Sequence, residues 1–312
     1  MASIKGKRIL VTGGAGFIGS HIVEALSADN EVLVIDDLTT GKRGNLEGMD
    51  AEVIVASVRD AEKVRSAMEG VDYVFHHAAI ASVPKSVDDP IASNQVNVCG
   101  TLRVLNEARA AKVRKVVFAS SSAVYGNTPS DLKREEDLPD PISPYAVTKL
   151  TGELYCRNFW LNYGLPTCSL RYFNVYGPRQ DPSSDYAAVV PRFISAARAG
   201  KPLTIFGDGE QTRDFIFVRD VVRANILAAL DEGHNGEAFN IACQERVSVN
   251  QLASLVLMEM GLSEEGMIEH RAERKGDVRH SLADIGKARR DLGFVPAYDI
   301  REGLSLTMAS RG

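Results

Sequence analysis

The sequence RILVTGGAGFIG, residues 8–19, decides the fold. A short apolar run that is typical of a buried strand leads into a glycine-rich turn, and an apolar segment with helical spacing follows. Gly13, Gly16 and Gly19 form a GxxGxxG pattern, which permits a tight turn, close approach of the backbone to a pyrophosphate and close helix–sheet packing. The helix would present free N–H groups and a partial positive charge to that anion. A tight turn without a ligand is the alternative, but the context favours dinucleotide binding.

Strand-like and helix-like segments alternate through the first half of the chain. Continuous apolar runs suit parallel strands that are buried on both faces. The predicted fold class is therefore α/β, a Rossmann-type doubly wound parallel sheet, completed by a returning strand at 237–242. We expect its other strands at 8–12, 31–36, 51–57, 71–79, 115–120 and 166–174, with helices at 17–28, 60–69, 90–112 and 144–163 between them.

The pattern is less regular beyond residue 175, where prolines mark loops. These features predict a smaller, discontinuous C-terminal lobe. We place the nucleotide-binding domain at 1–174 with a returning segment at about 215–243, and the second lobe at 175–214 and 244–312. Within the later part of the chain we expect helices at 187–199, 248–260, 284–292 and 299–309 and strands at 203–207 and 214–218.

Length and composition exclude several classes of protein. The chain has 312 residues, a net charge of −5 and 45% hydrophobic residues, which is the composition of an ordinary globular protein with a large core. Its mild acidity argues against nucleic acid as a partner. No apolar run approaches the ~20 residues of a membrane helix, and the first residues lack a signal-peptide core. We therefore expect a cytoplasmic protein with reduced cysteines, no membrane partner and no metal site.

The strand at 31–36 ends in Asp36, 17 residues after Gly19. A carboxylate at this position can accept both ribose hydroxyls of an adenosine and would repel a 2′-phosphate, which favours NAD over NADP. Lys42 and Arg43 follow closely and would soften this preference if they turned inward, but we expect them to be solvated.

Tyr145 and Lys149 lie one helical turn apart, on a helix that Ser143 would cap and Pro144 would begin. Lowering the pKa of a tyrosine from about 10 to about 7 requires roughly 4 kcal/mol. Two nearby cations, Lys149 and an oxidised nicotinamide, would supply it and make Tyr145 a base. We expect Tyr145 and Lys149 to face a cleft because the buried stripe of this helix would be Val147, Leu150, Leu154 and Leu161.

Motifs along the whole chain resemble one known family. In order they are GGAGFIG, HHAA, SSSAVYG, PYAVTK, RYFNVYGPRQ, FGDGEQTRDFIFV and GDVRHSLADI. Together they resemble the extended short-chain dehydrogenase/reductase family, and most closely its NAD-dependent nucleotide-sugar 4-epimerases, which act on UDP-glucose and UDP-N-acetylglucosamine. The resemblance implies an N-terminal Rossmann domain that binds NAD and a C-terminal lobe that binds a UDP-sugar.

The resemblance also implies the residues of the site. The catalytic residues would be Tyr145 as base, Lys149 as its partner and Ser121 as a ligand of the sugar O4. The cofactor residues would be Gly13, Gly16, Phe17, Ile18, Gly19, Asp36, Ser57, Val58, Ala78, Ala79, Asn97, Tyr145, Lys149 and Tyr172. The substrate residues would be Ser121, Ser122, Asn174, Val189, Thr204, Ile205, Phe206, Arg213, Arg274, Asp277 and Ser281. Among these, Arg213 and Arg274 would hold the diphosphate.

Three positions bear on the reaction and the sugar. Ser57 stands where the family usually has an Asp that bonds the adenine, so the adenine contact is weaker here. Ser122 and Ala123 stand where dehydratases and decarboxylases carry an acid/base carboxylate, so the sequence favours epimerisation. Ser281 stands where members restricted to non-acetylated sugars carry Tyr, which leaves room for a 2-acetamido group.

Several alternatives stay open at this point. The chain could be a UDP-glucuronate 4-epimerase, a net NAD(P)-dependent nucleotide-sugar oxidoreductase, or a catalytically silent protein that binds NAD. The family usually dimerises by pairing two long helices of each subunit, here 90–112 and 144–163, so we expect a homodimer. The apolar residues Leu102, Leu105 and Ala108 fit such pairing and fit packing on the sheet equally well.

Overall fold

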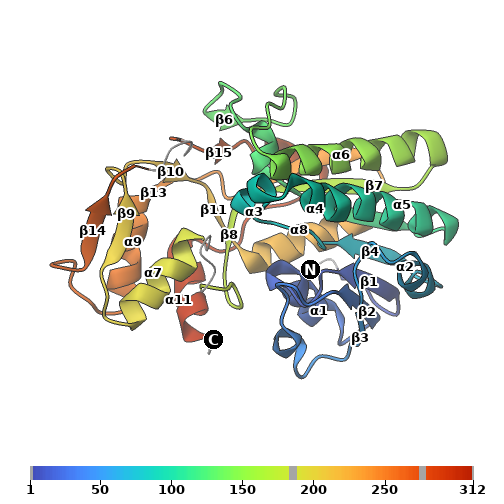
Figure 1. The fold of residues 1–312 in the computed structure, drawn as a ribbon, viewed down its shortest axis with the longest axis horizontal. Helices are drawn as coiled ribbons and strands as arrows, with labels where there is room; N and C mark the ends of the chain where they lie inside the picture. The colour runs from blue at the N-terminus through green and yellow to red at the C-terminus, as the bar shows by residue number, and fades with distance from the viewer. Residues whose placement is uncertain (1–2, 183–187, 274–278, 311–312) are drawn as a thin grey trace.

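A seven-stranded parallel sheet forms the centre of the computed structural model, which describes residues 3–182, 188–273 and 279–310 (Figure 1). Its strand order is β12-β7-β5-β4-β1-β2-β3, so the order reverses between β1 and β4, and ligands of such sheets bind at that reversal. The sheet confirms the predicted fold class. Its strands are β1 (Arg8–Thr12), β2 (Glu31–Asp36), β3 (Glu52–Val55), β4 (Tyr73–His76), β5 (Lys115–Ser121), β7 (Thr167–Tyr172) and β12 (Glu237–Ile241).

Helices cover both faces of this sheet (Figure 1). One apolar cluster joins one face to α1 (Phe17–Leu26) and α8 (Val218–Leu230). A second joins the opposite face to α2 (Ala61–Ala67), α5 (Thr101–Ala110) and α6 (Pro144–Tyr163). Burial on both faces explains why the strands read as continuous apolar runs rather than as alternating ones.

The segments after β7 build a third apolar cluster, to the left in Figure 1. Its main elements are α7 (Val189–Arg198), β9 (Leu203–Phe206), α9 (Val249–Glu259), β14 (Ile268–Arg271) and α11 (Ile300–Ala309). The shorter elements of the chain are η1 (Arg43–Leu46), α3 (Val83–Asp88), η3 (Ser122–Tyr125), β6 (Leu132–Lys133), β8 (Asn174–Tyr176), β10 (Thr212–Arg213), β11 (Phe215–Phe217), β13 (Val247–Ser248), β15 (Leu282–Ala283) and α10 (Gly286–Asp291).

Helix α6 begins as predicted but buries a different face from the one we expected. The Ser143 hydroxyl accepts a hydrogen bond from Ala146 N at 3.2 Å, and Pro144 is the first helical residue. The expected buried stripe is wrong, because the side chains of Val147, Leu154 and Leu161 are 48%, 59% and 67% exposed and Leu150 is half-buried. The buried face instead carries Ala146, Thr148, Lys149, Gly152, Glu153, Cys156 and Phe159.

Close packing on β5 explains which face of α6 turns inward. A Cβ at Gly152 would lie 2.3 Å from the ring of Phe118, so only glycine lets the helix approach that strand. The buried carboxylate of Glu153 on this face is paired with Arg171 of β7 at 2.8 Å. A polar face is therefore buried because its charged member has a partner.

The helical segment predicted at 90–112 consists of three parts. It runs through α4 (Pro90–Asn94), a π-helical turn η2 (Gln95–Gly100) and α5. Leu105 and Ala108 are fully buried against the sheet, while Leu102 is half-buried. Those residues therefore pack on the sheet. Helix α8 was not predicted, because it follows β11 directly and has no side-chain cap to mark its start.

Among the residues that the structure describes, no helix is both long and apolar enough to cross a membrane. Nor do three or more His, Cys, Asp or Glu side chains gather there in a way that could hold a metal ion.

Candidate active site

The glycine-rich turn has the geometry that a dinucleotide phosphate site needs. Gly13 has a φ of +70°, and a Cβ on it would lie 2.6 Å from the backbone nitrogen of Ala78. A Cβ on Gly19 would lie 2.2 Å from the carbonyl oxygen of Gly13. Helix α1 begins directly after Gly16, whose lack of a side chain leaves the first N–H groups, including those of Phe17, Ile18 and Gly19, without a side-chain cap. The turn is thus a cradle for an anionic pyrophosphate.

Asp36 lies at the carboxyl end of β2, beside this turn. Its buried carboxylate accepts hydrogen bonds from Ala15 N at 2.9 Å and from Leu38 N at 2.8 Å. Burial raises the pKa of Asp36, and these two backbone hydrogen bonds oppose that rise. A carboxylate has about four acceptor positions, so two remain for the hydroxyls of a ribose. The residues present therefore fit the adenosine half of NAD.

The neighbouring predicted cofactor residues differ in what they can offer. Ser57 accepts a hydrogen bond from Arg59 N at 3.3 Å, so its hydroxyl already shapes the turn after β3. The side chain of Val58 is buried against Gly100, where only its backbone is left for a ligand. Ala78 and Ala79 are half-buried beside Gly13, and the backbone nitrogen of Ala78 donates to Thr12 Oγ1 at 3.2 Å.

A buried hydrogen-bonded chain runs from β1 to the first turn of α6. Thr12 Oγ1 lies 2.6 Å from His76 Nδ1, and His76 Nε2 lies 2.9 Å from Thr101 Oγ1. Thr101 donates to the carbonyl oxygen of Asn97 at 2.6 Å, and Asn97 Nδ2 donates to Thr148 Oγ1 at 3.0 Å. Burial and the charge of Lys149 lower the pKa of His76 to about 3, so its neutral ring can accept from one threonine and donate to the other.

Asn97 lies in the π-helical turn η2, a kind of turn often found at functional sites. Its side chain also holds both the N–H and the carbonyl of Ile80, at 2.8 and 3.1 Å. These bonds engage both the oxygen and the nitrogen of the Asn97 side-chain amide. In this structure Asn97 therefore joins the segment after β4 to α6.

Tyr145 and Lys149 lie side by side but are more enclosed than we expected. Tyr145 is half-buried, and burial raises the pKa of Tyr145 while a hydrogen bond with the Ser121 side chain lowers it. Lys149 is buried, with Nζ 5.8 Å from the centre of the Tyr145 ring, and burial lowers the pKa of Lys149 to about 8. The chain alone therefore does not lower the pKa of Tyr145, because desolvation outweighs the one favourable hydrogen bond.

Ser121 connects the end of β5 to the short helix η3. Its hydroxyl accepts from Ala123 N at 3.1 Å and meets Tyr145, and Ser122 follows it, half-buried. Below them, Arg171 donates to Glu153 Oε2 at 2.8 Å and to Tyr125 Oη at 2.9 Å. This buried network holds η3 in place on the sheet.

Tyr172 lies at the end of β7, but its hydroxyl is already engaged. It is 3.0 Å from His77 Nε2 and 3.0 Å from Asn225 Oδ1. Its ring stacks on that of His77. Tyr172 therefore links His77, the residue after β4, to Asn225 of α8.

Asn174, residues 204–206 and Arg213, all predicted substrate residues, lie on β8, β9 and β10. Asn174 donates its backbone and side-chain N–H groups to the carbonyl oxygen of Asp214, both at 3.1 Å. Arg213 donates to Thr212 O at 2.9 Å, and Ser281 N donates to the same carbonyl at 3.2 Å. Arg213 and Ser281 therefore lie next to each other, because both donate to the carbonyl oxygen of Thr212.

The remaining predicted substrate residues divide by burial. Thr204 and Phe206 are half-buried on one face of β9, whereas Ile205 points into the core of the lobe and has only its backbone left for a base. Val189 is half-buried at the start of α7. Arg274 and Asp277 lie outside the described residues.

Comparison with known proteins shows the family of the chain. The model of the NAD-dependent epimerase/dehydratase family matches residues 9–242. The chain belongs to this family. It is 41% identical over 302 residues to a putative UDP-glucose 4-epimerase of Methanocaldococcus jannaschii, covering 95% of both chains.

Solved structures agree with this family assignment. A UDP-N-acetylglucosamine 4-epimerase from Methanobrevibacter ruminantium, in complex with UDP-N-acetylmuramic acid, is 42% identical with a TM-score of 0.94 and 98% coverage of both chains. A UDP-glucose 4-epimerase from Thermotoga maritima with UDP-glucose is 42% identical, with a TM-score of 0.91 over 96% of this chain and 97% of that one. The predicted resemblance to an epimerase family is confirmed.

Sequence reasoning missed several residues that support this candidate active site. The Ser86 hydroxyl accepts from Tyr145 N at 3.0 Å, and Thr148 links Asn97 to the Tyr145 carbonyl. The buried carboxylate of Asp214 accepts from Cys243 N and Ala283 N at 2.9 and 3.1 Å. Thr148 stands between Tyr145 and Lys149 and could have been suspected, whereas contacts spanning 29 to 69 residues carry no sequence signal.

Proposed function

We propose that this protein is an NAD-dependent UDP-hexose 4-epimerase that acts through a 4-keto sugar. The observation that carries the proposal is the meeting of Tyr145 and Ser121 beside the buried Lys149, at the carboxyl end of β5. This group lies on the same edge of the sheet as the glycine-rich cradle and Asp36. A proton acceptor, a hydroxyl ligand and a cofactor site are thus held on one rigid frame.

In the proposed reaction, Tyr145 takes the proton from O4 of the sugar while Ser121 holds that oxygen. When bound, the nicotinamide accepts the C4 hydride and later returns it. The keto sugar presents its other face before the return, and Tyr145 gives the proton back to O4, so configuration at C4 inverts with no net redox change. Lys149 brings a positive charge close to Tyr145, and together with the charge of a bound oxidised nicotinamide it would favour the deprotonated tyrosine, which the chain alone does not.

We further propose UDP-N-acetylglucosamine and UDP-N-acetylgalactosamine as substrates, with UDP-glucose and UDP-galactose as a second pair. The support is Ser281, a small half-buried residue whose backbone is tied to Thr212, next to Arg213. Arg213 is a predicted ligand of the diphosphate, so Ser281 would stand near the hexose. Solved epimerases named for UDP-N-acetylglucosamine and for UDP-glucose are each 42% identical to this chain, which supports both pairs equally.

The experiment incubates purified protein separately with UDP-glucose, UDP-N-acetylglucosamine and UDP-glucuronate, without added cofactor, and separates the products. We expect the C4 epimer of the acetamido sugar and of UDP-glucose. Conversion of UDP-glucuronate alone would favour the alternative of a glucuronate epimerase. Turnover that requires added NAD(P) and consumes it in proportion to product would favour a net oxidoreductase.

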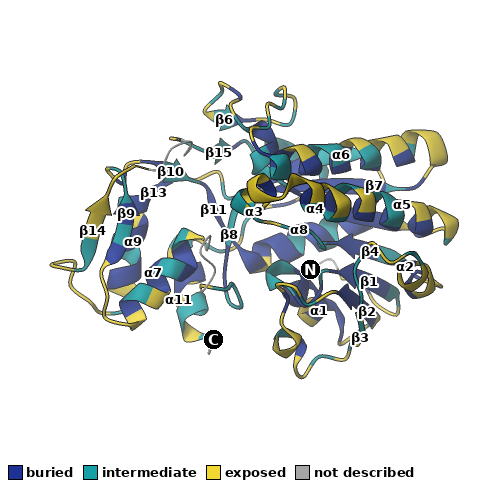
Figure 2. Ribbon diagram, in the orientation of Figure 1, coloured by how far each residue is buried: buried dark blue, intermediate teal, exposed yellow. Residues whose placement is uncertain are grey.

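We also propose a homodimer that forms through α6 and its neighbours. The stripe of Val147, Leu154 and Leu161 faces solvent, and helices α3 and α4 lie against α6 and expose Val87 and Ile91 (Figure 2). Apolar side chains gathered on one face mark a protein contact. A second copy of this chain, pairing the same helices, would bury them.

A further inference from the structure

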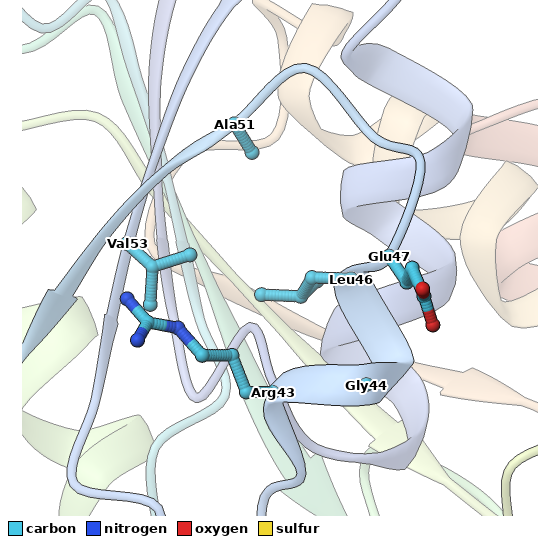
Figure 3. A pocket seen from close by; sticks show the side chains of 6 residues that line it. All are labelled: Arg43, Gly44, Leu46, Glu47, Ala51 and Val53. Atoms are coloured by element: carbon cyan, nitrogen blue, oxygen red, sulfur yellow. The ribbon is translucent and has the colours of Figure 1, made fainter.

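The segment that follows Asp36, residues 37–46, lies against the Asp36 carboxylate through Leu38 N and Gly41, and much of it is exposed. Leu46 is the buried residue of its helical turn η1. A surface pocket of about 440 Å³ lies between η1 and β3, lined by Arg43, Gly44, Leu46, Glu47, Ala51 and Val53 (Figure 3). On the side of this pocket the segment has little apolar cover, while Leu46 and Leu38 pack on the core from the other side. Polar contacts supply the remaining links.

Two of these contacts lie within the segment's own lobe. The backbone N–H of Lys42 donates to the carbonyl oxygen of Ala15 at 3.0 Å, and Asn45 Nδ2 donates to the same oxygen at 2.8 Å. Ala15 belongs to the glycine-rich turn, and its N–H bonds Asp36. Segment 37–46, the glycine-rich turn and the carboxylate of Asp36 are thus all joined at Ala15.

The third contact comes from far along the chain. Arg179 follows β8, and its guanidinium donates to the carbonyl oxygen of Asn45 at 3.2 Å and also to His21 and Glu24 of α1. His21 Nε2 returns a bond to Pro178 O at 2.9 Å. Burial lowers the pKa of His21 to about 4, so the neutral ring accepts from Arg179 on one side and donates to Pro178 on the other.

Arg179 holds this position in an unfavourable backbone conformation. Its φ is +66°, a region that residues other than glycine rarely adopt and that persists only where surrounding contacts enforce it. The adjacent ion pair between Lys42 and Asp181, at 3.2 Å, joins the same two segments. Strain at this point is consistent with a functional contact rather than a simple turn.

We propose that Arg179 is the latch that retains the dinucleotide. Hydride leaves and returns to the same sugar, so the cofactor must stay bound between the two half-reactions. Segment 37–46 lies against the Asp36 carboxylate through Leu38 N and Gly41, so loosening it would ease the release of the adenosine. Arg179 anchors this segment to α1 and to the residues after β8. The inference rests on the proposed function in one respect, that the NAD ribose binds Asp36.

The test measures the release of NAD from purified holoenzyme. Wild type, Arg179→Ala, Asp36→Ala and the control Arg290→Ala are compared, since Arg290 is an exposed arginine paired with its neighbour Asp291. Bound NAD is quantified after gel filtration, and its release is followed as exchange with excess labelled NAD. We expect Arg179→Ala to release NAD about tenfold faster than wild type, because charge-assisted hydrogen bonds are lost, and Arg290→Ala to match wild type.

Each outcome decides one point. Wild-type release from a folded Arg179→Ala variant would overturn the latch. Wild-type retention by Asp36→Ala would instead show that the ribose does not bind Asp36, which is a failure of the proposed cofactor site. If Arg179→Ala does not fold, Arg179→Lys carries the same test, because lysine keeps the charge but lacks the fork that spans Asn45 and α1.

Discussion

The Nζ atom of Lys149 donates a hydrogen bond to the carbonyl oxygen of Ala119 at 2.7 Å. This bond ties helix α6 to the end of strand β5, two residues before Ser121. The ammonium group is therefore fixed by the sheet, and Tyr145, one turn earlier on the helix, is held beside it.

Replacing Tyr145 by Phe removes the proposed proton acceptor and little else. We expect turnover of the UDP-sugar to fall about 100-fold or more, which is the range of a lost acid–base group. Steady-state kinetics measures this, with the amount of bound NAD and the circular dichroism spectrum as controls. Unaltered turnover would make the proposed mechanism wrong.

Replacing Lys149 by Met separates activity from stability. Burial lowers the pKa of Lys149 from 10.5 to about 8, so the unfolded chain binds more protons than the folded protein between these values. The contribution of Lys149 to the free energy of unfolding of wild type therefore increases as pH rises from 8 to 10.5. We expect the variant to lose activity, and its stability relative to wild type to be highest below pH 8.

Urea unfolding of both proteins across pH 7–10.5 checks this expectation. Most other titrating groups cancel in the difference between the two proteins. A difference that stays constant with pH would contradict the buried, costly charge assigned to Lys149.

For Asp214 we expect a pH dependence of stability that is opposite in sign to that of Lys149 and lies at acid pH. Burial raises the pKa of Asp214 from 3.8 to about 6, so the folded protein binds the extra proton between these values. Its contribution to stability is thus greater at pH 4 and falls as pH rises to 6. We expect the stability of wild type relative to Asp214→Asn to decrease over that window and then to level off.

Replacing Ser281 by Tyr tests the choice of sugar. A bulky ring would fill the space that we assign to the 2-acetamido group. We expect kcat/KM for UDP-N-acetylglucosamine to fall about tenfold relative to that for UDP-glucose, while Ser281→Ala keeps the wild-type ratio. If Ser281→Tyr and Ser281→Ala showed the same ratio of kcat/KM for the two sugars, Ser281 would not line the sugar site.

Replacing Leu154 by Glu tests the proposed dimer. A charge at the centre of the exposed stripe of α6 would be buried on association, so we expect this variant to elute as a monomer. Val295→Glu is the matched control, because Val295 is an exposed apolar residue on a different surface. Light scattering after gel filtration gives the mass of each species, and a wild-type monomer would contradict the dimer.

The sequence alone predicted those features that depend on residues close together in the chain. The turn at Gly13 and the cap at Ser143 involve neighbours a few residues away, and both are confirmed. The alternation of apolar runs and helical segments predicted the sheet for the same reason, since each strand carries its own burial pattern.

Only the tertiary structure decided how the helix faces and the site are assembled. The exposed leucines of α6 and its buried Glu153 reverse the expected pattern, because a buried charge depends on a partner such as Arg171, which lies on another element. Likewise, the sequence contained the segment after Asp36 and the residue Arg179, but their contact spans 134 residues and arises only when the chain folds. Local patterns determine elements, whereas pairing of distant polar groups determines which side of each element becomes the site.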